Sequence, residues 1–178
     1  LADMSRLYVS GNAVAKQAQK LTSARERLGK IGGFELFNEV NGDEIMEKAA
    51  ERAVNLLKAK PAPSGRFTVI ADPRLAGVFA HEAVGHACEA DLVIAGESIL
   101  AGKLGKVVGS ELVSIFDDST LAEGWGTQQY DDEGVPATRT YLIQEGVLVG
   151  RLHSRETAAK MGEQPTGNAR AIDYRYPP

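Results

Sequence analysis

The segment HEAVGHACEAD, residues 81–91, restricts the backbone of this chain more than any other stretch. His81 and His86 are five positions apart, and successive residues of an α-helix are rotated by about 100°. On a regular helix the two side chains would point about 140° away from each other and could not bind one ion. Gly85 can relax into a π-bulge or end the helix, which would turn His86 back toward His81.

A break of that kind would create a metal site. Two neutral imidazoles suit Zn²⁺, and Glu82 could take a proton from a water molecule that the ion activates, which is metal-assisted hydrolysis. The alternative is a pair of unrelated histidines in a core helix, because H-E-x-x-x-H departs from the familiar zinc-protease spacing. The number of histidines supports the metal site. The chain has only three, and two of them stand beside a glutamate in an otherwise apolar segment.

Two other residues are candidate ligands by type. Cys88 lies two positions after His86, about 160° away around a helix, so we expect a small buried hydrophobic residue. His153 closes a predicted strand, where it could supply a third ligand or be a partly exposed histidine. The acidic runs at 117–118 and 131–133 lack the alternating spacing of a calcium loop, and we expect solvated loops or local caps.

Composition argues against several classes of partner. The chain has 178 residues, a formal charge of −4 and a pI near 5.5, with no cluster of Lys and Arg, so we expect no nucleic-acid partner. It has no apolar run of about 18 residues and no visible signal peptide, so we expect no membrane partner and no export. Its single cysteine cannot form an internal disulfide, which predicts a cytoplasmic location.

The first half of the chain predicts two strands, a helix and a connector. Residues 7–30 favour two strands, the first with a Ser-Gly-Asn turn, although part of this segment has helix-forming composition. Apolar residues recur at helical spacing over 43–58, and Asn41 with Glu44 matches a capping box. The PAPSG connector at 61–65 marks a possible subdivision of the chain.

The second half alternates irregularly between strands and helices. We expect strands at 67–72 and 111–118, a short helix at 96–103, a hairpin through Glu145-Gly146, a helix at 154–162, and a largely buried motif helix over 77–91. The predicted fold class is therefore α+β, with a mixed, largely antiparallel sheet, flanking helices and a buried motif helix.

Several segments resemble the TldD/PmbA family of metallopeptidases, in colinear order from about Gly33 to the end. They are HEAVGHACEAD, GESILAGKLGKVVGSELVSIFDD, DDEGVPATRTYLIQEGVLVGRLHSRETAAKMG and PTGNARA. The resemblance implies that His81 and His86 bind zinc and that Glu82 is catalytic. It also implies that Glu89 and Asp91, at acidic positions of the extended motif, contact the ligands rather than the ion.

The resemblance also implies a larger protein. Members of the family are much longer, and their third zinc ligand is a cysteine near the C-terminus that Cys88 does not match. Residues 1–178 are thus expected to be the central portion of a TldD-like peptidase, inactive on their own. The whole protein is expected to cleave small or unfolded peptides in the cytoplasm, as a homodimer or with a PmbA/TldE-like subunit. The alternative is a non-catalytic scaffold or partner-type subunit, against which the intact His81, Glu82 and His86 argue.

Overall fold

The computed structural model describes residues 5–122, 124–171 and 175–178. These residues form two compact units. The first unit extends to Thr68 and includes Trp125, and the second consists of Val69–Ala122 and Gly126–Pro178. The connector at 61–65 lies shortly before this boundary and contains no helix or strand.

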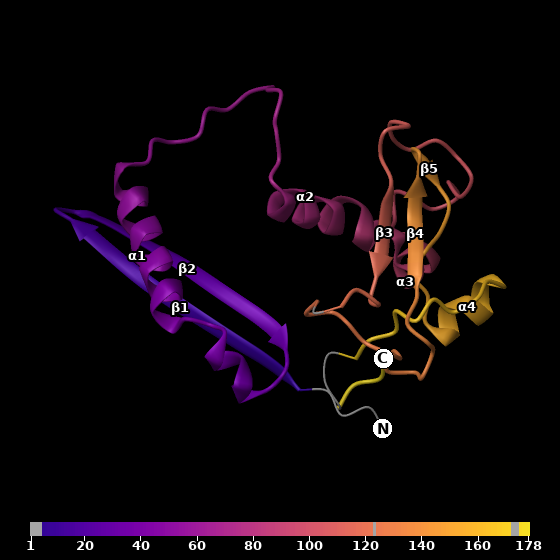
Figure 1. Ribbon diagram of the computed structural model, residues 1–178. Helices are drawn as coiled ribbons and strands as arrows, with labels where there is room; N and C mark the ends of the chain where they lie inside the picture. Colours follow the sequence, from indigo (N-terminus) through magenta and orange to yellow (C-terminus); the bar gives the residue numbers. More distant parts are fainter. Residues whose placement is uncertain (1–4, 123, 172–174) are drawn as a thin grey trace. The chain divides into compact units, whose positions relative to one another are not determined.

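The first unit is a long β-hairpin covered by one helix (Figure 1). Strands β1 (Arg6–Gln17) and β2 (Lys20–Ile31) pair in antiparallel orientation along their whole length. The two predicted strands are therefore confirmed. The chain turns at Ala18, whose φ of 52° lies in the left-handed region, and not at the Ser-Gly-Asn tripeptide.

Helix α1 (Gly42–Lys58) lies along this hairpin, after a short 3₁₀ helix, η1 (Phe34–Asn38). Asn41 caps α1, because its side-chain oxygen accepts a backbone N–H of the first turn, which confirms the predicted start of the helix. Ala53 is fully buried, and its carbonyl accepts a hydrogen bond from the Thr22 hydroxyl at 2.7 Å. A small side chain at this position lets the helix approach the hairpin closely.

The second unit carries the motif segment on four consecutive helical segments. They are α2 (Pro73–Ala80), the π-helical turn η2 (His81–Gly85), the 3₁₀ turn η3 (His86–Cys88) and α3 (Ala90–Ala95). Asp72 starts α2, since its carboxylate accepts the N–H of Leu75 at 2.7 Å and a proline follows at the first helical position.

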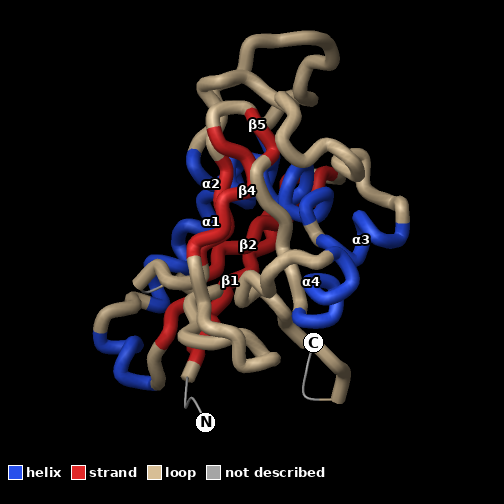
Figure 2. Tube along the Cα trace, turned by 90° about the vertical axis from the view of Figure 1, so that its right-hand side faces the viewer, coloured by secondary structure: helices blue, strands red, loops and turns tan. Residues whose placement is uncertain are grey.

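A three-stranded antiparallel sheet completes the second unit, in the order β3 (Ile115–Asp118), β4 (Arg139–Gln144), β5 (Val147–Leu148). Figure 2 shows β4 and β5 side by side at a tight turn. That turn is made by Glu145 and Gly146, with φ of 48° and 80°, the conformation of a two-residue hairpin loop. The predicted hairpin is therefore confirmed.

The core of the second unit joins the motif segment to this sheet. Its buried members are Cys88, Leu100, Leu142, Ile143 and Leu148. Helix α4 (Arg155–Met161) lies after the sheet and is confirmed at both ends. Ser154 caps its first turn, and Gly162 ends it in the left-handed conformation.

The predicted fold class is confirmed as a mixture of helices and antiparallel sheets. Two local predictions are wrong, and a third is correct only in part. Residues 67–72 form no strand, because no described strand pairs with them, and Ile70 is almost fully exposed. The segment 96–103 forms turns, and the strand predicted at 111–118 is restricted to 115–118.

The prediction of a buried motif helix is also wrong. No residue of α2 is buried, and His81, Glu82 and His86 are all exposed. The apolar residues Val78 and Phe79 favoured burial, but both are more than half exposed. Among the described residues, no helix combines the length and the hydrophobicity needed to cross a bilayer.

Candidate metal centre

The histidine spacing is accommodated by the π-helical turn between α2 and η3. The backbone N–H of His86 donates to the carbonyl of His81, five residues earlier, and the imidazole centroids are 4.5 Å apart. One extra residue in the turn thus cancels the angular mismatch of a regular α-helix. The expected break in helix geometry near Gly85 is confirmed.

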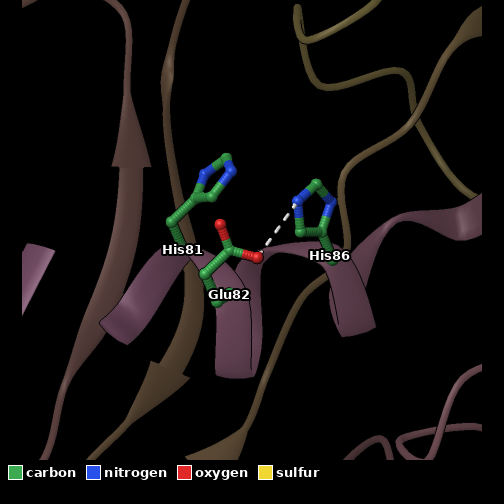
Figure 3. Close-up of side chains that lie close together, drawn as sticks. All are labelled: His81, Glu82 and His86. Carbon is green, nitrogen blue, oxygen red and sulfur yellow. Dashed lines mark ion pairs between the residues drawn. The ribbon is translucent and has the colours of Figure 1, made fainter. Parts of the chain in front are cut away.

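His81, Glu82 and His86 form one cluster of possible metal donors (Figure 3). One ligand atom from each residue lies within 4.8 Å of the others. The Nε2 atom of His86 is 3.9 Å from Oε2 of Glu82. All three residues are exposed, so an ion and a substrate could reach the donor atoms from solvent.

Glu89 fixes the orientation of His86. Its Oε1 atom is 3.0 Å from Nδ1 of His86, so Nε2 is the ring nitrogen left to face the cluster. The backbone on both sides of Glu89 is anchored to a neighbouring segment, because Leu152 donates to the carbonyl of Cys88 and accepts from the N–H of Ala90. A carboxylate on the far nitrogen of a histidine is the usual support of a metal-binding imidazole.

Asp91 lies apart from this arrangement. It is exposed in the first turn of α3 and is not a member of the donor cluster. Of the two acidic residues predicted to contact the ligands, the structure brings only Glu89 to a histidine.

Cys88 is a buried residue, as predicted. It is 1% exposed and packs in the hydrophobic core. Burial raises the pKa of its thiol to about 11, although the positive charge of Arg151 opposes this shift. The thiolate form that binds metals is therefore scarce at neutral pH.

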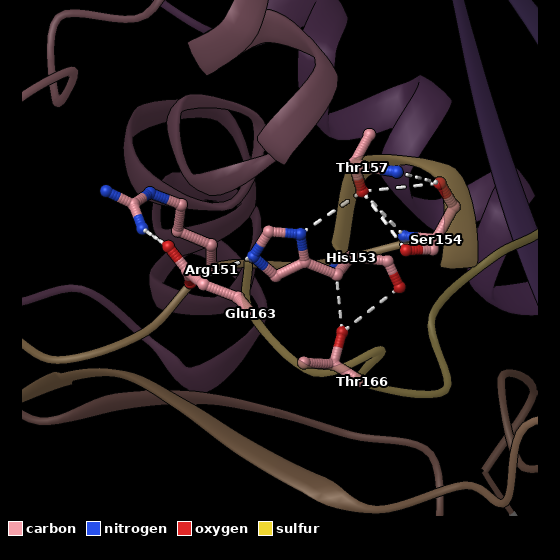
Figure 4. A network of polar contacts seen from close by, with 6 residues as sticks. All are labelled: Arg151, His153, Ser154, Thr157, Glu163 and Thr166. Carbon is pink, nitrogen blue, oxygen red and sulfur yellow. Dashed lines mark hydrogen bonds and ion pairs between the residues drawn. The ribbon is translucent and has the colours of Figure 1, made fainter. Parts of the chain in front are cut away.

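His153 is neither a ligand nor a partly exposed histidine, so both readings of the sequence are wrong. It is 2% exposed. Its Nδ1 lies 3.1 Å from the Thr157 hydroxyl and its Nε2 lies 3.0 Å from Oε2 of Glu163 (Figure 4). Glu163 also binds Arg151, and Thr166 donates and accepts at the His153 backbone. Both ring nitrogens are thus already occupied.

The donor chemistry of the cluster fits zinc. Two imidazoles are typical zinc ligands, and a carboxylate beside them is the type of group that can act as a general base. Catalytic zinc sites take three protein ligands, and neither Cys88 nor His153 can serve as the third. Within the described part of the chain, only these three residues meet as a possible metal cluster.

A cavity of about 850 Å³ opens beside the cluster. His81 and Glu89 line it from the motif segment, and Asp117, Ser119 and Asn168 line it from β3 and the C-terminal region. Its volume is typical of a binding site for a small ligand. The sequence analysis assigned Asp117 to a solvated loop or local cap and did not single out Ser119 or Asn168.

Comparison with known proteins matches this chain to metallopeptidases and metalloproteases. Residues 64–178 match the PmbA/TldA metallopeptidase C-terminal domain. A metalloprotease of Methanothermobacter thermautotrophicus is 50% identical over 167 residues, which cover 94% of this chain and 37% of that protein. The zinc metalloprotease TldD homolog of Saccharolobus solfataricus is 32% identical over 176 residues, which cover 98% of this chain and 39% of that protein.

The fold has a counterpart of known structure. A proposed modulator of a DNA gyrase from Thermotoga maritima MSB8 is similar with a TM-score of 0.71 and 31% identity, over 93% of this chain and 37% of that one. The chain therefore spans less than two fifths of the length of the proteins that it matches.

Proposed function

Because the chain belongs to the PmbA/TldD metallopeptidase family, we propose that it carries the catalytic motif of a zinc-dependent peptidase acting on small or unfolded peptides. The π-helical turn is the observation that carries this proposal, because it gathers His81, Glu82 and His86 within 4.8 Å. A regular helix would have separated the two imidazoles, so the irregular turn has a chemical purpose in this reading.

The roles follow from the chemistry of each side chain. His81 and His86 would hold the ion, and Glu89 engages Nδ1 of His86, which leaves Nε2 as the nitrogen available for a metal. When bound, zinc would supply Lewis-acid chemistry toward the peptide carbonyl and toward water. Glu82 accepts the proton of the attacking water and returns it to the leaving amine.

The third ligand is proposed to come from a part of the protein outside this chain, and family resemblance suggests a cysteine. Two imidazoles alone bind zinc weakly compared with a three-ligand site. The 178-residue chain by itself is therefore expected to bind the metal poorly and to lack peptidase activity. We further propose a cytoplasmic location and a homodimer, or a pair with a PmbA/TldE-like subunit.

Metal analysis and a peptidase assay on the longest native form of the protein test this function. We expect about one zinc ion per chain and hydrolysis of short unstructured peptides, and we expect both to be lost in His81→Ala and His86→Ala. Glu111→Ala is the control, since it changes an exposed residue of the same unit outside the cluster. A protein that binds no zinc and cleaves no peptide would instead be a non-catalytic scaffold or partner-type subunit.

A further inference from the structure

Two residues that line the cavity beside the donor cluster, Ser119 and Asn168, each have a polar atom without a hydrogen-bond partner in the described chain. Asn168 donates through Nδ2 to Oδ1 of Asp117 at 2.7 Å, which holds these two side chains together. The other amide atom, Oδ1 of Asn168, is buried without a hydrogen-bond partner, and so is Oγ of Ser119. Ser119 is 9% exposed. Buried polar atoms almost always have partners in folded proteins, so these two atoms have hydrogen-bonding capacity left for a further group.

The charges around the cavity are mostly negative. The carboxylates that line it are those of Glu89, Asp91, Asp117, Asp118 and Glu156. Asp118 is paired with Arg139, and Glu156 is paired with Lys160. Asp117 has no cationic partner among the described residues, although it is only partly exposed. It therefore presents an uncompensated negative charge beside the two unpartnered atoms.

An ammonium group matches this corner of the cavity. It carries a positive charge and three N–H donors with no acceptor, which complements the Asp117 carboxylate, the Asn168 carbonyl and the Ser119 hydroxyl. A carboxylate or phosphate ligand would meet Asp117 with like charge. Arg170 is the one Lys or Arg side chain among the described residues that line the cavity, and it is exposed.

We propose that Asp117, Ser119 and Asn168 form a subsite that binds an ammonium group of a peptide substrate. The group is either the free α-amino terminus or a lysine side chain, since both offer the same chemistry. His81 and Glu89 line the same cavity, so a peptide held in the subsite extends toward the donor cluster. This inference rests on the proposed function for the identity of the ligand as a peptide.

Equilibrium binding tests the subsite without requiring turnover. The protein is the longest native form carrying Glu82→Gln, and the probes are three amidated tripeptides: Ala-Ala-Ala with a free amino end, N-acetyl-Ala-Ala-Ala, and N-acetyl-Ala-Lys-Ala. Titration calorimetry measures their Kd values. We expect at least one ammonium-bearing peptide to bind about tenfold more tightly than the acetylated alanine peptide, as for a charge-assisted hydrogen bond. Which of the two binds better identifies the source of the ammonium group.

Substitutions then assign the preference to Asp117. Asp117→Asn keeps the shape of the side chain and an acceptor for Asn168, and we expect it to abolish the tenfold preference while leaving the acetylated alanine peptide unaffected. Glu111→Gln is the matched control, because it removes one charge from an exposed residue of the same unit outside the cavity lining. We expect it to change none of the three Kd values.

Two outcomes would overturn the subsite. One is equal binding, or no measurable binding, of all three peptides by the parent protein. The other is an Asp117→Asn variant that weakens all three alike, because the side chain would then only maintain structure. Zinc content and hydrolysis by the unsubstituted protein are measured in parallel. Zinc-dependent hydrolysis without an ammonium preference refutes the subsite alone, whereas an ammonium preference without hydrolysis refutes the proposed function alone.

Discussion

His86 and His153 belong to the same unit and are held in opposite ways. His86 is exposed, with Nδ1 on Glu89 and Nε2 directed to the donor cluster. His153 is buried, with Nδ1 on Thr157 and Nε2 on Glu163. An imidazole with one nitrogen left over can bind a metal, whereas one with both nitrogens engaged can only stabilise the interior.

The two environments are joined through the backbone. Leu152, next to His153, hydrogen-bonds to the residues on both sides of Glu89, and Glu89 in turn orients His86. The buried polar network therefore supports the segment from which the exposed cluster is built. Substitutions should separate the two roles: changes around His86 should affect metal and activity, and changes around His153 should affect stability.

The largest expected effect is that of Glu82→Gln on activity. An amide has the shape of the carboxylate but cannot accept a proton from water, and a general base is typically worth about 10²- to 10⁴-fold in rate. We expect peptide hydrolysis by the longest native form to fall by that factor while the zinc content is retained. Loss of zinc in this variant would make Glu82 a ligand and would refute its assignment as the base.

Glu89→Gln should weaken zinc binding by about 10- to 100-fold, since a neutral amide supports the His86 imidazole less well than a carboxylate does. Competition with a chelator of known affinity measures this change. Asp91→Asn is the matched control, because Asp91 lies outside the cluster. Equal losses in the two variants would show that overall negative charge, and not the contact to His86, controls zinc affinity.

Glu163→Ala should lower the free energy of unfolding by about 2 kcal/mol, since it leaves the buried Arg151 guanidinium without its carboxylate. The expected loss is smaller than for a fully buried pair, because 32% of the Glu163 side chain is exposed to solvent. Urea denaturation measures the loss, and Glu111→Ala serves as the exposed control. A variant of normal stability that binds no zinc would contradict the separation of the two histidine environments.

The sequence predicted the local features whose causes are local. The caps at Asn41 and Ser154 and the Glu145-Gly146 turn are confirmed because a few neighbouring residues determine them. The histidine spacing predicted the helix break for the same reason. Zinc ligation and the catalytic role of Glu82 remain predictions from these residues and from family resemblance.

The failed predictions depend on distant parts of the chain. Residues 67–72 have strand-forming side chains, but a strand needs a partner, and the described chain offers none there. His153 was misjudged because its partner Glu163 is ten positions away, beyond any helical or strand period. The cavity residue Asn168 meets Asp117 across 51 positions, a separation that no single-sequence pattern reveals.

The smallest expected effect concerns Gly85, to which sequence reasoning assigned the helix break. Its φ of −51° and ψ of −61° are open to any L-residue, and an added Cβ would come no closer than 3.8 Å to the carbonyl of Ala80 and 4.0 Å to Nδ1 of His81. The π-helical turn therefore does not require glycine.

We expect Gly85→Ala to keep the zinc affinity and to raise the free energy of unfolding by about 0.5 kcal/mol, because alanine has less conformational freedom to lose in a helical turn. Zinc titration and urea denaturation measure both quantities. A large loss of zinc affinity would show that the turn must flex at Gly85 to bind the metal, and the exposed histidine site would then be less rigid than the buried one.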